Sequence, residues 1–342
     1  MSNRKTSKVL SKTRGGCCTE GKHAYNRETM KLVLAASALA LITFGMALSQ
    51  QPSLPALRVA GNMTTIELSP VLVAANGLYR GPITVINGGI PNIMSGEVDV
   101  ATNAETQLLR QSVDDPSLRV ILTVAESFYR IVGRKSAGIR RVADLKGKKI
   151  TTPRNTSAHY YLAKMLATAK LTEADITFVA ITPVTDMSKA LKDGRVDAIA
   201  MWEPEAELAI EALGSDAIVL QDRRVYRELF NLNTSTKALN DPAKRKAVVE
   251  LVRSIVSASE RLRSKPQELW PYIGSKLNYT PQLIQKCWPE LKYAGGMVKD
   301  LLDVMEQEEP WVAKERNRTP RTRAQLAMLI DDSVLKEALA GR

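Results

Sequence analysis

Short β-prone runs alternate with helical segments along most of this 342-residue chain. The runs predicted as strands are 57–61, 84–86, 98–102, 119–125, 129–133, 149–152, 177–181, 198–201 and 217–220. Segments with apolar residues at helical spacing lie between most of them. Because the rhythm starts again after Gly138, we predict an α/β fold with two lobes, each a mixed, mainly parallel sheet flanked by helices.

A local repeat supports this division into two halves. Residues 95–101 read SGEVDVA, and residues 193–199 read DGRVDAI. In each segment a glycine ends a helix, a charged residue follows, and a β-branched residue opens a strand. The repeat therefore favours two lobes of similar build.

The pattern after Asp241 is helical. Pro242 marks a helix start, since proline has no N–H to lose in a first turn. Helices are predicted at 242–262, 266–277, 281–288, 297–312 and 323–339. The last predicted strand is therefore 217–220.

Residues 1–49 are predicted to be a leader with a cleaved signal peptide. Residues 32–48 carry no charge, which is short for a bilayer span of about 20 residues. Ala47 and Ser49 fit the small residues of a cleavage site, so we expect cleavage near Gln50. The mature protein would be periplasmic or secreted, without a lipobox cysteine. An uncleaved N-terminal anchor is the alternative, and Met30 is an alternative initiator to Met1.

The positive charge of the chain divides into two equal parts. The net charge is +12, of which residues 1–31 carry +6 through eight Lys or Arg and two Glu. The other basic residues are spread along the chain, without a basic run or interleaved aromatic residues. We therefore expect no nucleic acid partner.

Few residues are available for metal or disulfide chemistry. The histidines are His23 and His159, and the cysteines are Cys17, Cys18 and Cys287. Only one of each follows the leader, which excludes a histidine-rich metal site and an intrachain disulfide in the mature chain. We predict no metal, no cofactor and no catalytic residue.

The segment from residue 149 to residue 169 is the candidate ligand site. It reads as a strand, a turn that begins at Pro153, and a helix at 158–169 with one apolar face. The turn residues Asn155, Thr156 and Ser157 are preferred helix N-cap residues. Free N–H groups in a first helical turn suit a small anion. An ordinary capped helix is the alternative.

Four segments carry a family resemblance: ADLKGKKI at 143–150, PRNTSAHY at 153–160, GRVDAIAMWEP at 194–204 and SGEVDVA at 95–101. Over about 57–212 the chain resembles the solute-binding proteins of nitrate, sulfonate and taurine importers. That group shares its domain with fungal thiamine-pyrimidine synthases. The resemblance implies a periplasmic-binding-protein (type II) clamshell that delivers a small solute to an ABC transporter.

The resemblance also implies lobe boundaries and ligand contacts. Lobe 1 would be discontinuous, at 56–132 plus 222–342, and lobe 2 would span 133–221. The implied ligand-binding residues are Thr64, Thr65, Asn103, Asn155, Thr156, Ser157, Ala158, His159, Trp202 and Glu203. The chain departs from the family between Gly77 and Gly96, where the segment is short, and it lacks the cysteine-rich motif of the pyrimidine synthases.

Several of these residues have a second interpretation. His159 could line the cleft, be a solvent-side residue or be a capping partner, and Trp202 could stack on a ligand or belong to the core. Arg154 could add positive charge to the site or point to solvent. The acidic residues at predicted helix starts are Glu67, Glu203 and Glu205. They would be solvated acids, or one of them would face the cleft and favour a zwitterion.

The sequence thus predicts an exported, monomeric solute-binding protein rather than an enzyme. Its partners would be a small anionic or zwitterionic solute and an ABC transporter permease. An alkanesulfonate or taurine is expected first, then nitrate or an aromatic carboxylate, held mainly by backbone N–H groups and hydroxyls with little need for a paired cation. Hinges are expected near 129–133 and 219–222. The alternatives are an enzyme of pyrimidine biosynthesis or degradation on the same fold, and a scavenging or signalling receptor without an importer.

Overall fold

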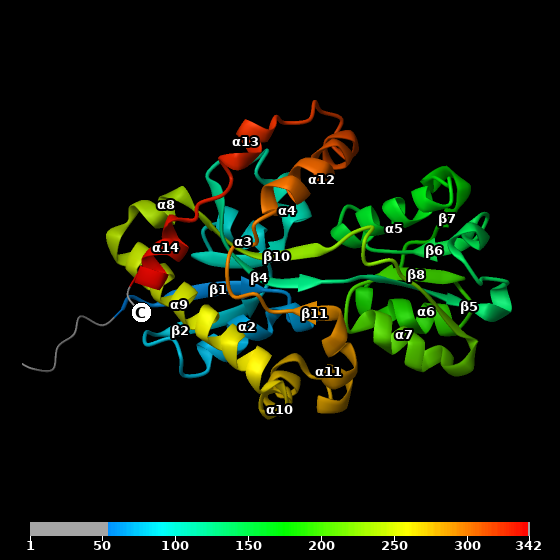
Figure 1. Ribbon diagram of the computed structural model, residues 1–342, viewed down its shortest axis with the longest axis horizontal. Coiled ribbons are helices and arrows are strands. Elements are labelled where there is room, and N and C mark those ends of the chain that lie inside the picture. The colour runs from blue at the N-terminus through cyan, green and yellow to red at the C-terminus, as the bar shows by residue number, and fades with distance from the viewer. Residues whose placement is uncertain (1–53, 341–342) are drawn as a thin grey trace, which may run out of the picture. The chain divides into compact units, whose positions relative to one another are not determined.

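The computed structural model describes residues 54–340, which contain two sheets with helices packed against them (Figure 1). The predicted leader and signal peptide lie outside the described residues. The α/β fold class is confirmed. No helix among the described residues is long and apolar enough to span a bilayer.

The first sheet has six strands in the order β11-β4-β10-β3-β1-β2. These strands are β1 (Leu57–Gly61), β2 (Ile83–Asn87), β3 (Val100–Ala104), β4 (Leu118–Ser127), β10 (Glu228–Ser235) and β11 (Leu291–Lys292). Strand β1 pairs in parallel with β2 and β3, whereas β10 pairs antiparallel with β3 and β4.

The second sheet has five strands in the order β7-β6-β8-β5-β9. These strands are β5 (Arg130–Arg134), β6 (Lys149–Thr151), β7 (Thr177–Phe178), β8 (Ala198–Met201) and β9 (Ala217–Leu220). Strand β6 pairs in parallel with β7 and β8, and β5 pairs antiparallel with β8 and β9. The parallel pairs come from alternating strands and helices, and the antiparallel pairs involve the strands next to the chain crossings between the sheets.

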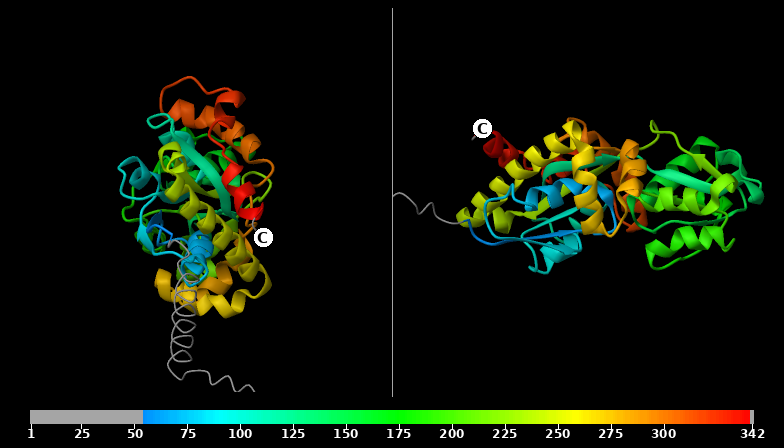
Figure 2. Two further views of the ribbon diagram at one scale, coloured as in Figure 1. Left: turned by 90° about the vertical axis from the view of Figure 1, so that its left-hand side faces the viewer. Right: turned by 90° about the horizontal axis from the view of Figure 1, so that it is seen from below.

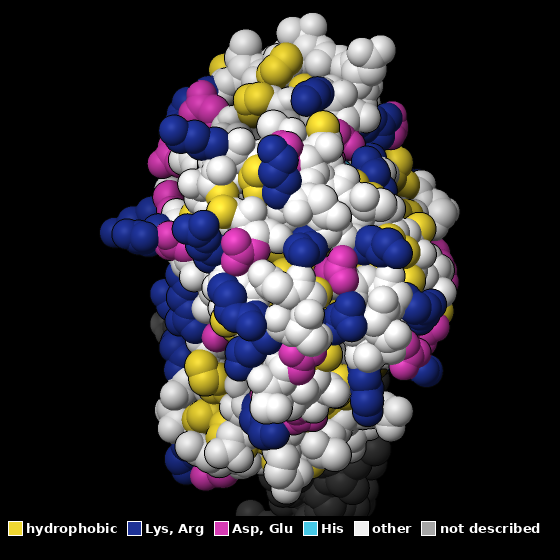
Figure 3. All heavy atoms as spheres, turned by 90° about the vertical axis from the view of Figure 1, so that its right-hand side faces the viewer, with side chains coloured by type: hydrophobic (Ala, Val, Ile, Leu, Met, Phe, Trp, Pro, Cys, Tyr) yellow, Lys and Arg dark blue, Asp and Glu magenta, His cyan; other side chains and the backbone are white. Residues whose placement is uncertain are grey.

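Two chain segments join the sheets, Phe128–Tyr129 between β4 and β5, and 221–227 between β9 and β10 (Figures 1 and 2). The first sheet therefore takes strands from both ends of the described chain. The boundaries predicted for the two lobes stay a prediction. On the side of the molecule where the second sheet lies, basic and acidic side chains are interspersed (Figure 3).

Helices cover the faces of both sheets. The α-helices are α2 (Ser69–Ala75), α3 (Ile90–Met94), α4 (Glu105–Gln111), α5 (Ser157–Thr168), α6 (Met187–Lys192), α7 (Glu205–Leu213), α8 (Thr236–Asn240), α9 (Pro242–Ser264), α10 (Pro266–Leu277), α11 (Pro281–Cys287), α12 (Leu301–Glu315), α13 (Arg323–Ala327) and α14 (Ser333–Ala340). The 3-10 helices are η1 (Ile66–Leu68), η2 (Lys135–Ala137), η3 (Val142–Leu145), η4 (Glu173–Asp175), η5 (Val184–Asp186), η6 (Gly214–Asp216) and η7 (Trp288–Glu290).

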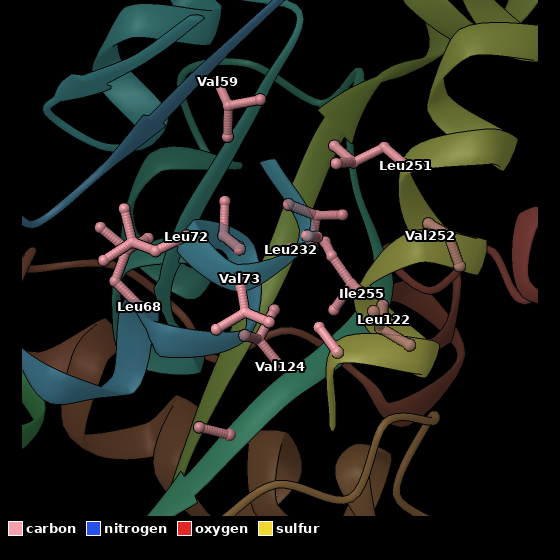
Figure 4. Packing of buried hydrophobic residues seen from close by; sticks show 14 of the residues in the cluster. Val59, Leu68, Leu72, Val73, Leu122, Val124, Leu232, Leu251, Val252 and Ile255 are labelled. Atoms are coloured by element: carbon pink, nitrogen blue, oxygen red, sulfur yellow. The ribbon is translucent and has the colours of Figure 1, made fainter. Parts of the chain in front are cut away.

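Helix α9 covers one face of the first sheet. Its start follows from sequence, because Asp241 accepts hydrogen bonds from two first-turn N–H groups and Pro242 occupies the first helical position. Its buried Val252 and Ile255 pack in one cluster with Leu122 of β4 and Leu232 of β10 (Figure 4). Each such buried aliphatic side chain contributes about 1.5–3 kcal/mol relative to an exposed one.

The repeat found in the sequence forms the same turn in both sheets. Gly96 and Gly194 both have positive φ, at 75° and 73°. The aspartates that follow, Asp99 and Asp197, each accept a backbone N–H from the start of the neighbouring strand, at 3.1 Å and 2.9 Å. The carboxylate therefore fixes where the two strands begin to pair.

The main difference from the predicted elements is β10, which the sequence did not indicate. The helix predicted at 297–312 begins four residues later, at Leu301. The helix predicted at 323–339 divides into α13 and α14, because the chain at Ile330 is extended and forms a bridge with Val120 of β4. The predicted helix 323–339 is therefore interrupted where its backbone pairs with β4.

Candidate functional site

A cavity of about 640 Å³ is lined by residues attached to both sheets. It is lined by Asn62, Glu67, Asn87, Gly88, Gly89, Pro91, Asn92, Asn103, Ala104, Gln107, Arg110, Gln111, Tyr129, Arg154, Asn155, Thr156, Ser157, Trp202, Glu228 and Phe230. Its size is typical of a site for an organic small molecule. Seven of these side chains are Asn or Gln, which can both donate and accept hydrogen bonds.

One side of the cavity, here called the turn wall, is formed by residues 154–157. Asn155 has a left-handed φ of 63°, and its N–H donates to His159 Nδ1 at 3.2 Å. Thr156 is the N-cap residue of α5, but its hydroxyl donates to the Pro153 carbonyl at 2.6 Å instead of capping the helix. The first N–H of α5 that bonds within the helix belongs to Tyr160. The preceding first-turn amides of α5 therefore remain available to an anion.

The turn wall is held by two contacts from other elements. Gln107 of α4 donates its side-chain N–H to the Asn155 carbonyl at 2.9 Å. The Ser157 hydroxyl lies 2.8 Å from the hydroxyl of Tyr129 in the crossing segment between β4 and β5. The first contact ties the turn to a helix that follows β3, and the second ties it to the crossing segment.

Two arginines line the cavity, contrary to the expectation that a paired cation is not needed. Arg110 of α4 has a buried Nη1 atom with no hydrogen-bond partner. Burial lowers the pKa of Arg110, and nearby Arg316 adds to this effect. The guanidinium of Arg154 lies 4.6 Å from the ring centroid of Phe178 and is exposed. Among the described residues neither arginine forms a salt bridge, so both charges can serve a ligand.

A second part of the cavity lining, here called the carboxyl wall, consists of Glu67 and Glu228. Both are almost fully buried, at 3% and 1% exposure. The Ser127 hydroxyl contacts a carboxyl oxygen of each, with 2.7 Å to Glu228. Burial raises the pKa of both glutamates, and the pKa of Glu228 is raised further by Glu67. Glu67, for which a solvated position was one of the two interpretations of the sequence, is therefore enclosed at this position.

Five predicted site residues line the cavity. They are Asn103, Asn155, Thr156, Ser157 and Trp202. The Asn103 side chain also accepts the Ile90 N–H at 2.8 Å, which fixes the start of α3 beside the cavity. Trp202 follows β8 and packs on Tyr129, with 6.1 Å between ring centroids.

The other five predicted site residues do not line the cavity. Thr64 is exposed, and its hydroxyl donates to Asn62 at 2.7 Å. Thr65 is buried and donates to Glu67 at 2.6 Å. Ala158 faces the core behind α5. The remaining two are His159 and Glu203.

His159 and Glu203 are removed from the cavity by partners that the local sequence does not show. The His159 ring is fully buried between Phe178 and Trp311, and its Nε2 lies 3.1 Å from Glu173. Glu203 is buried and pairs with Arg130 at 2.6 Å. The structure agrees with the capping interpretation, because His159 Nδ1 accepts the Asn155 N–H at 3.2 Å, whereas the ring lies neither at the cleft nor in solvent but in the core.

Sequence reasoning did not identify Arg110, Gln107 or Glu228 as site residues. Arg110 and Gln107 lie one turn apart on α4, so they share a face of that helix, and this spacing was a detectable signal. Glu228 gave no such signal, because it opens the unpredicted strand β10. No group of three or more potential metal ligands occurs within residues 54–340.

A family model described as NMT1/THI5 like matches residues 87–268 of the chain. A relative described as an aliphatic sulfonates-binding protein of Escherichia coli (strain K12) is 36% identical over 80 residues. That match covers 23% of this chain and only 25% of the relative.

Solved structures share the fold. The alkanesulfonate-binding protein SsuA from Xanthomonas axonopodis pv. citri, bound to MOPS, matches with a TM-score of 0.65 at 19% identity, over 83% of this chain and 99% of that one. The desulfurization enzyme DSZB matches with a TM-score of 0.63 at 16% identity, over 84% and 99% of the two chains. The likeness confirms the predicted solute-binding-protein fold, which occurs in a binding protein and in an enzyme.

Proposed function

Since the chain belongs to the NMT1/THI5-like family, we propose that it is an extracytoplasmic solute-binding protein for a small oxyanion-bearing organic compound. It would hand this solute to the permease of an ABC importer. The observation that carries the proposal is the cavity between the two sheets, where the turn wall presents first-turn amides and two arginines stand without salt-bridge partners. Such groups suit an anionic oxygen, because helix N-termini and guanidinium groups both bind oxyanions.

The two sheets would belong to lobes that close around the solute, with lobe 1 at 56–132 plus 222–342 and lobe 2 at 133–221. Contacts across the cavity support a closed form. The Gln107 bond to Asn155 crosses from α4 to the turn wall, and Trp311 of α12 packs against the His159 ring of α5 at 5.1 Å between centroids. The two crossing segments would act as hinges.

A sulfonate is the first candidate for the oxyanion. The relatives named for sulfonate binding support this class, and the cavity is far larger than nitrate alone would fill. Trp202, Tyr129 and Phe230 line the cavity and would pack on the carbon part of the ligand. An aromatic carboxylate follows as the second candidate.

Thermal unfolding of the purified protein with a ligand panel tests the proposal. The panel contains alkanesulfonates, aminoalkanesulfonates, aromatic carboxylates, nitrate and pyrimidine precursors. A solute at 100 times its dissociation constant adds about 2.7 kcal/mol, which moves the midpoint of a chain this size by several degrees. A shift confined to sulfonates supports the proposal. No shift with any oxyanion, or conversion of a panel compound to product, would contradict it.

A further inference from the structure

The carboxyl wall contains one proton more than a pair of ionised glutamates would hold. The Ser127 hydroxyl has a single hydrogen, yet its oxygen lies within hydrogen-bond distance of Glu67 Oε1 and of Glu228 Oε2. One of these two contacts therefore needs a proton on a carboxyl group. The Thr65 hydroxyl already donates to the other oxygen of Glu67 at 2.6 Å.

The surroundings of this pair supply negative rather than positive charge. Within the described residues, neither Glu67 nor Glu228 forms a salt bridge. Arg227, the nearest cation in sequence to Glu228, pairs with Glu126 at 3.0 Å and Asp300 at 2.8 Å. Glu105 raises the pKa of Glu228 further. The pair in turn raises the pKa of three neighbouring tyrosines, so the groups in electrostatic contact with it are Glu105, Tyr129, Tyr226 and Tyr293. None of these four is cationic.

The same cavity holds unpaired positive charge elsewhere. Arg110 projects from α4 and Arg154 from the turn wall, and the Arg110 Nη1 atom is buried without a partner. A cavity that is lined by carboxyl groups without a cationic partner and by arginines without a salt-bridge partner is complementary to a ligand that carries both signs, because an unpaired charge is costly where it is buried.

We propose, on the basis of the proposed function, that the solute carries a protonated amine as well as its oxyanion, and that the ammonium group takes the place of the proton shared by Glu67, Ser127 and Glu228. The oxyanion then lies at the turn wall and Arg110. Binding releases the shared proton to solvent, so the ammonium faces two carboxylates. The carboxyl wall selects amine-bearing solutes over simple alkanesulfonates.

Isothermal titration of the purified protein with 3-aminopropane-1-sulfonate and butane-1-sulfonate tests this inference. The two compounds have nearly the same length and differ by an ammonium in place of a methyl group. The titrations use two buffers of different ionisation enthalpy, neither of them a sulfonate, so that proton release can be counted. We expect about one proton released near pH 7 with the amine and none with butanesulfonate. The affinity for the amine should rise with pH by up to about tenfold per unit.

Variants separate the carboxyl wall from general effects of buried carboxyl groups. In Glu67→Gln, Glu228 no longer faces a second carboxyl group at this position and shares no proton with it, so proton release should fall while amine binding persists. The double variant Glu67→Gln/Glu228→Gln should bind the amine about 10-fold or more weaker and leave butanesulfonate within about threefold. Glu308→Gln is the matched control, because Glu308 is equally buried and bonds Thr106 at 2.6 Å but does not line the cavity. Thermal midpoints report whether each variant is folded.

The outcomes are distinct. Equal affinity for both compounds in the wild type, or an unchanged preference in the double variant, overturns the ammonium site while leaving the proposed function intact. Failure of both compounds to bind overturns both. The same loss in Glu308→Gln would show that the preference does not come from the carboxyl wall.

Discussion

The turn wall and the carboxyl wall face the same cavity but are built in opposite ways. The turn wall comes from consecutive residues, 154–157, whose conformation depends on neighbours within five positions, such as His159. The carboxyl wall joins Glu67 and Glu228, which lie far apart in sequence and meet through Ser127. A binding surface made of consecutive residues can be predicted from the sequence, whereas one made of residues that only the fold brings together cannot.

The two walls also hold their polar groups differently. The turn wall offers backbone amides, whose protons do not change with pH in the physiological range. The carboxyl wall offers groups whose pKa values burial has raised. We therefore expect the turn wall to determine whether an oxyanion binds. We expect the carboxyl wall to determine which oxyanion-bearing solute is preferred and how its affinity changes with pH.

The largest expected effect is on the turn wall. Ser157→Pro removes an amide donor and the hydroxyl that contacts Tyr129. The fold should tolerate it, because residue 157 opens α5 and Thr156 has the extended backbone that a residue before proline adopts, with φ −119° and ψ 172°. Losing bonds to a charged group predicts about 100-fold weaker sulfonate binding or more. Titration calorimetry checks this, and near-normal affinity in a folded variant would remove the turn wall from the site.

The next effect is a pH dependence of the free energy of unfolding, and it comes from the buried carboxyl groups at and behind the carboxyl wall. Glu105 lies behind the carboxyl wall, accepts the Leu229 N–H at 2.9 Å, and has a pKa raised to about 7 by burial. A carboxyl whose pKa is higher when folded binds its proton more tightly in the folded state, so its contribution is full below about pH 4.5 and is lost as pH rises through 7. The linked loss is about 3 kcal/mol over that whole range and about 2 kcal/mol between pH 5.5 and pH 8. Urea unfolding at pH 5.5 and pH 8 measures it.

Glu105→Gln is the control for that titration. The variant cannot lose a proton at this position, so its stability should fall less between pH 5.5 and pH 8 than that of the wild type. The buried carboxyls Glu67, Glu228 and Glu308 also have raised pKa values and act in the same direction. A wild-type stability that rises from pH 5.5 to pH 8 is incompatible with this description of the buried carboxyl groups.

A smaller effect distinguishes the two arginines. Arg110→Met should weaken sulfonate binding by about 10-fold or more, because it removes a charge-assisted bond from a partly buried guanidinium. Arg154→Met should cost only about two- to fivefold, since Arg154 is exposed and stacks on Phe178. Titrations at low and high salt measure both, and the Arg154 effect should shrink more in salt. The reverse order would place the oxyanion nearer the surface.

The smallest effect compares the repeated turns of the two sheets. Gly96→Ala and Gly194→Ala both force a Cβ onto a backbone with positive φ, at a cost of about 1 kcal/mol each. A Cβ at Gly194 would lie 2.9 Å from Arg134 Nη1, whereas none of the surrounding atoms lies within 4 Å of one at Gly96. Because the arginine end is flexible, Gly194→Ala should cost only slightly more. Urea unfolding of the pair checks the difference, and a cheaper Gly194→Ala would contradict it.

The sequence was sufficient for the α/β class, the repeated turns and the position of the turn wall, because each depends on residues close together in the chain. Strand β10 was missed because Asn231 and Asn233 interrupt its apolar pattern. Both side chains are fully buried, and Asn231 accepts the Thr123 hydroxyl of β4 at 2.9 Å. The Asn231 Oδ1 and the Asn233 Nδ2 have partners more than 100 residues away, Thr123 and Ala101, which no local pattern reveals.

His159 illustrates the same limit within the predicted site. Its place in the first helical turn suggested a cleft, solvent or capping position, and the ring does accept the Asn155 N–H, but Trp311 comes from α12, about 150 residues later, to bury it. Conversely, Asn87 and Asn92 come from the short segment between Gly77 and Gly96 and do line the cavity. Only the packing of distant segments decides which of these side chains reaches the ligand.

A crystal structure of the protein with the sulfonate that raises its thermal midpoint most tests the central claim directly. The sulfonate oxygens should lie within about 3 Å of the Ser157 or Ala158 N–H and of the Arg110 guanidinium. Any amine of that ligand should lie against Glu67 and Glu228. A sulfonate bound outside this cavity, or inside it with its oxygens against the carboxyl wall, would contradict the account.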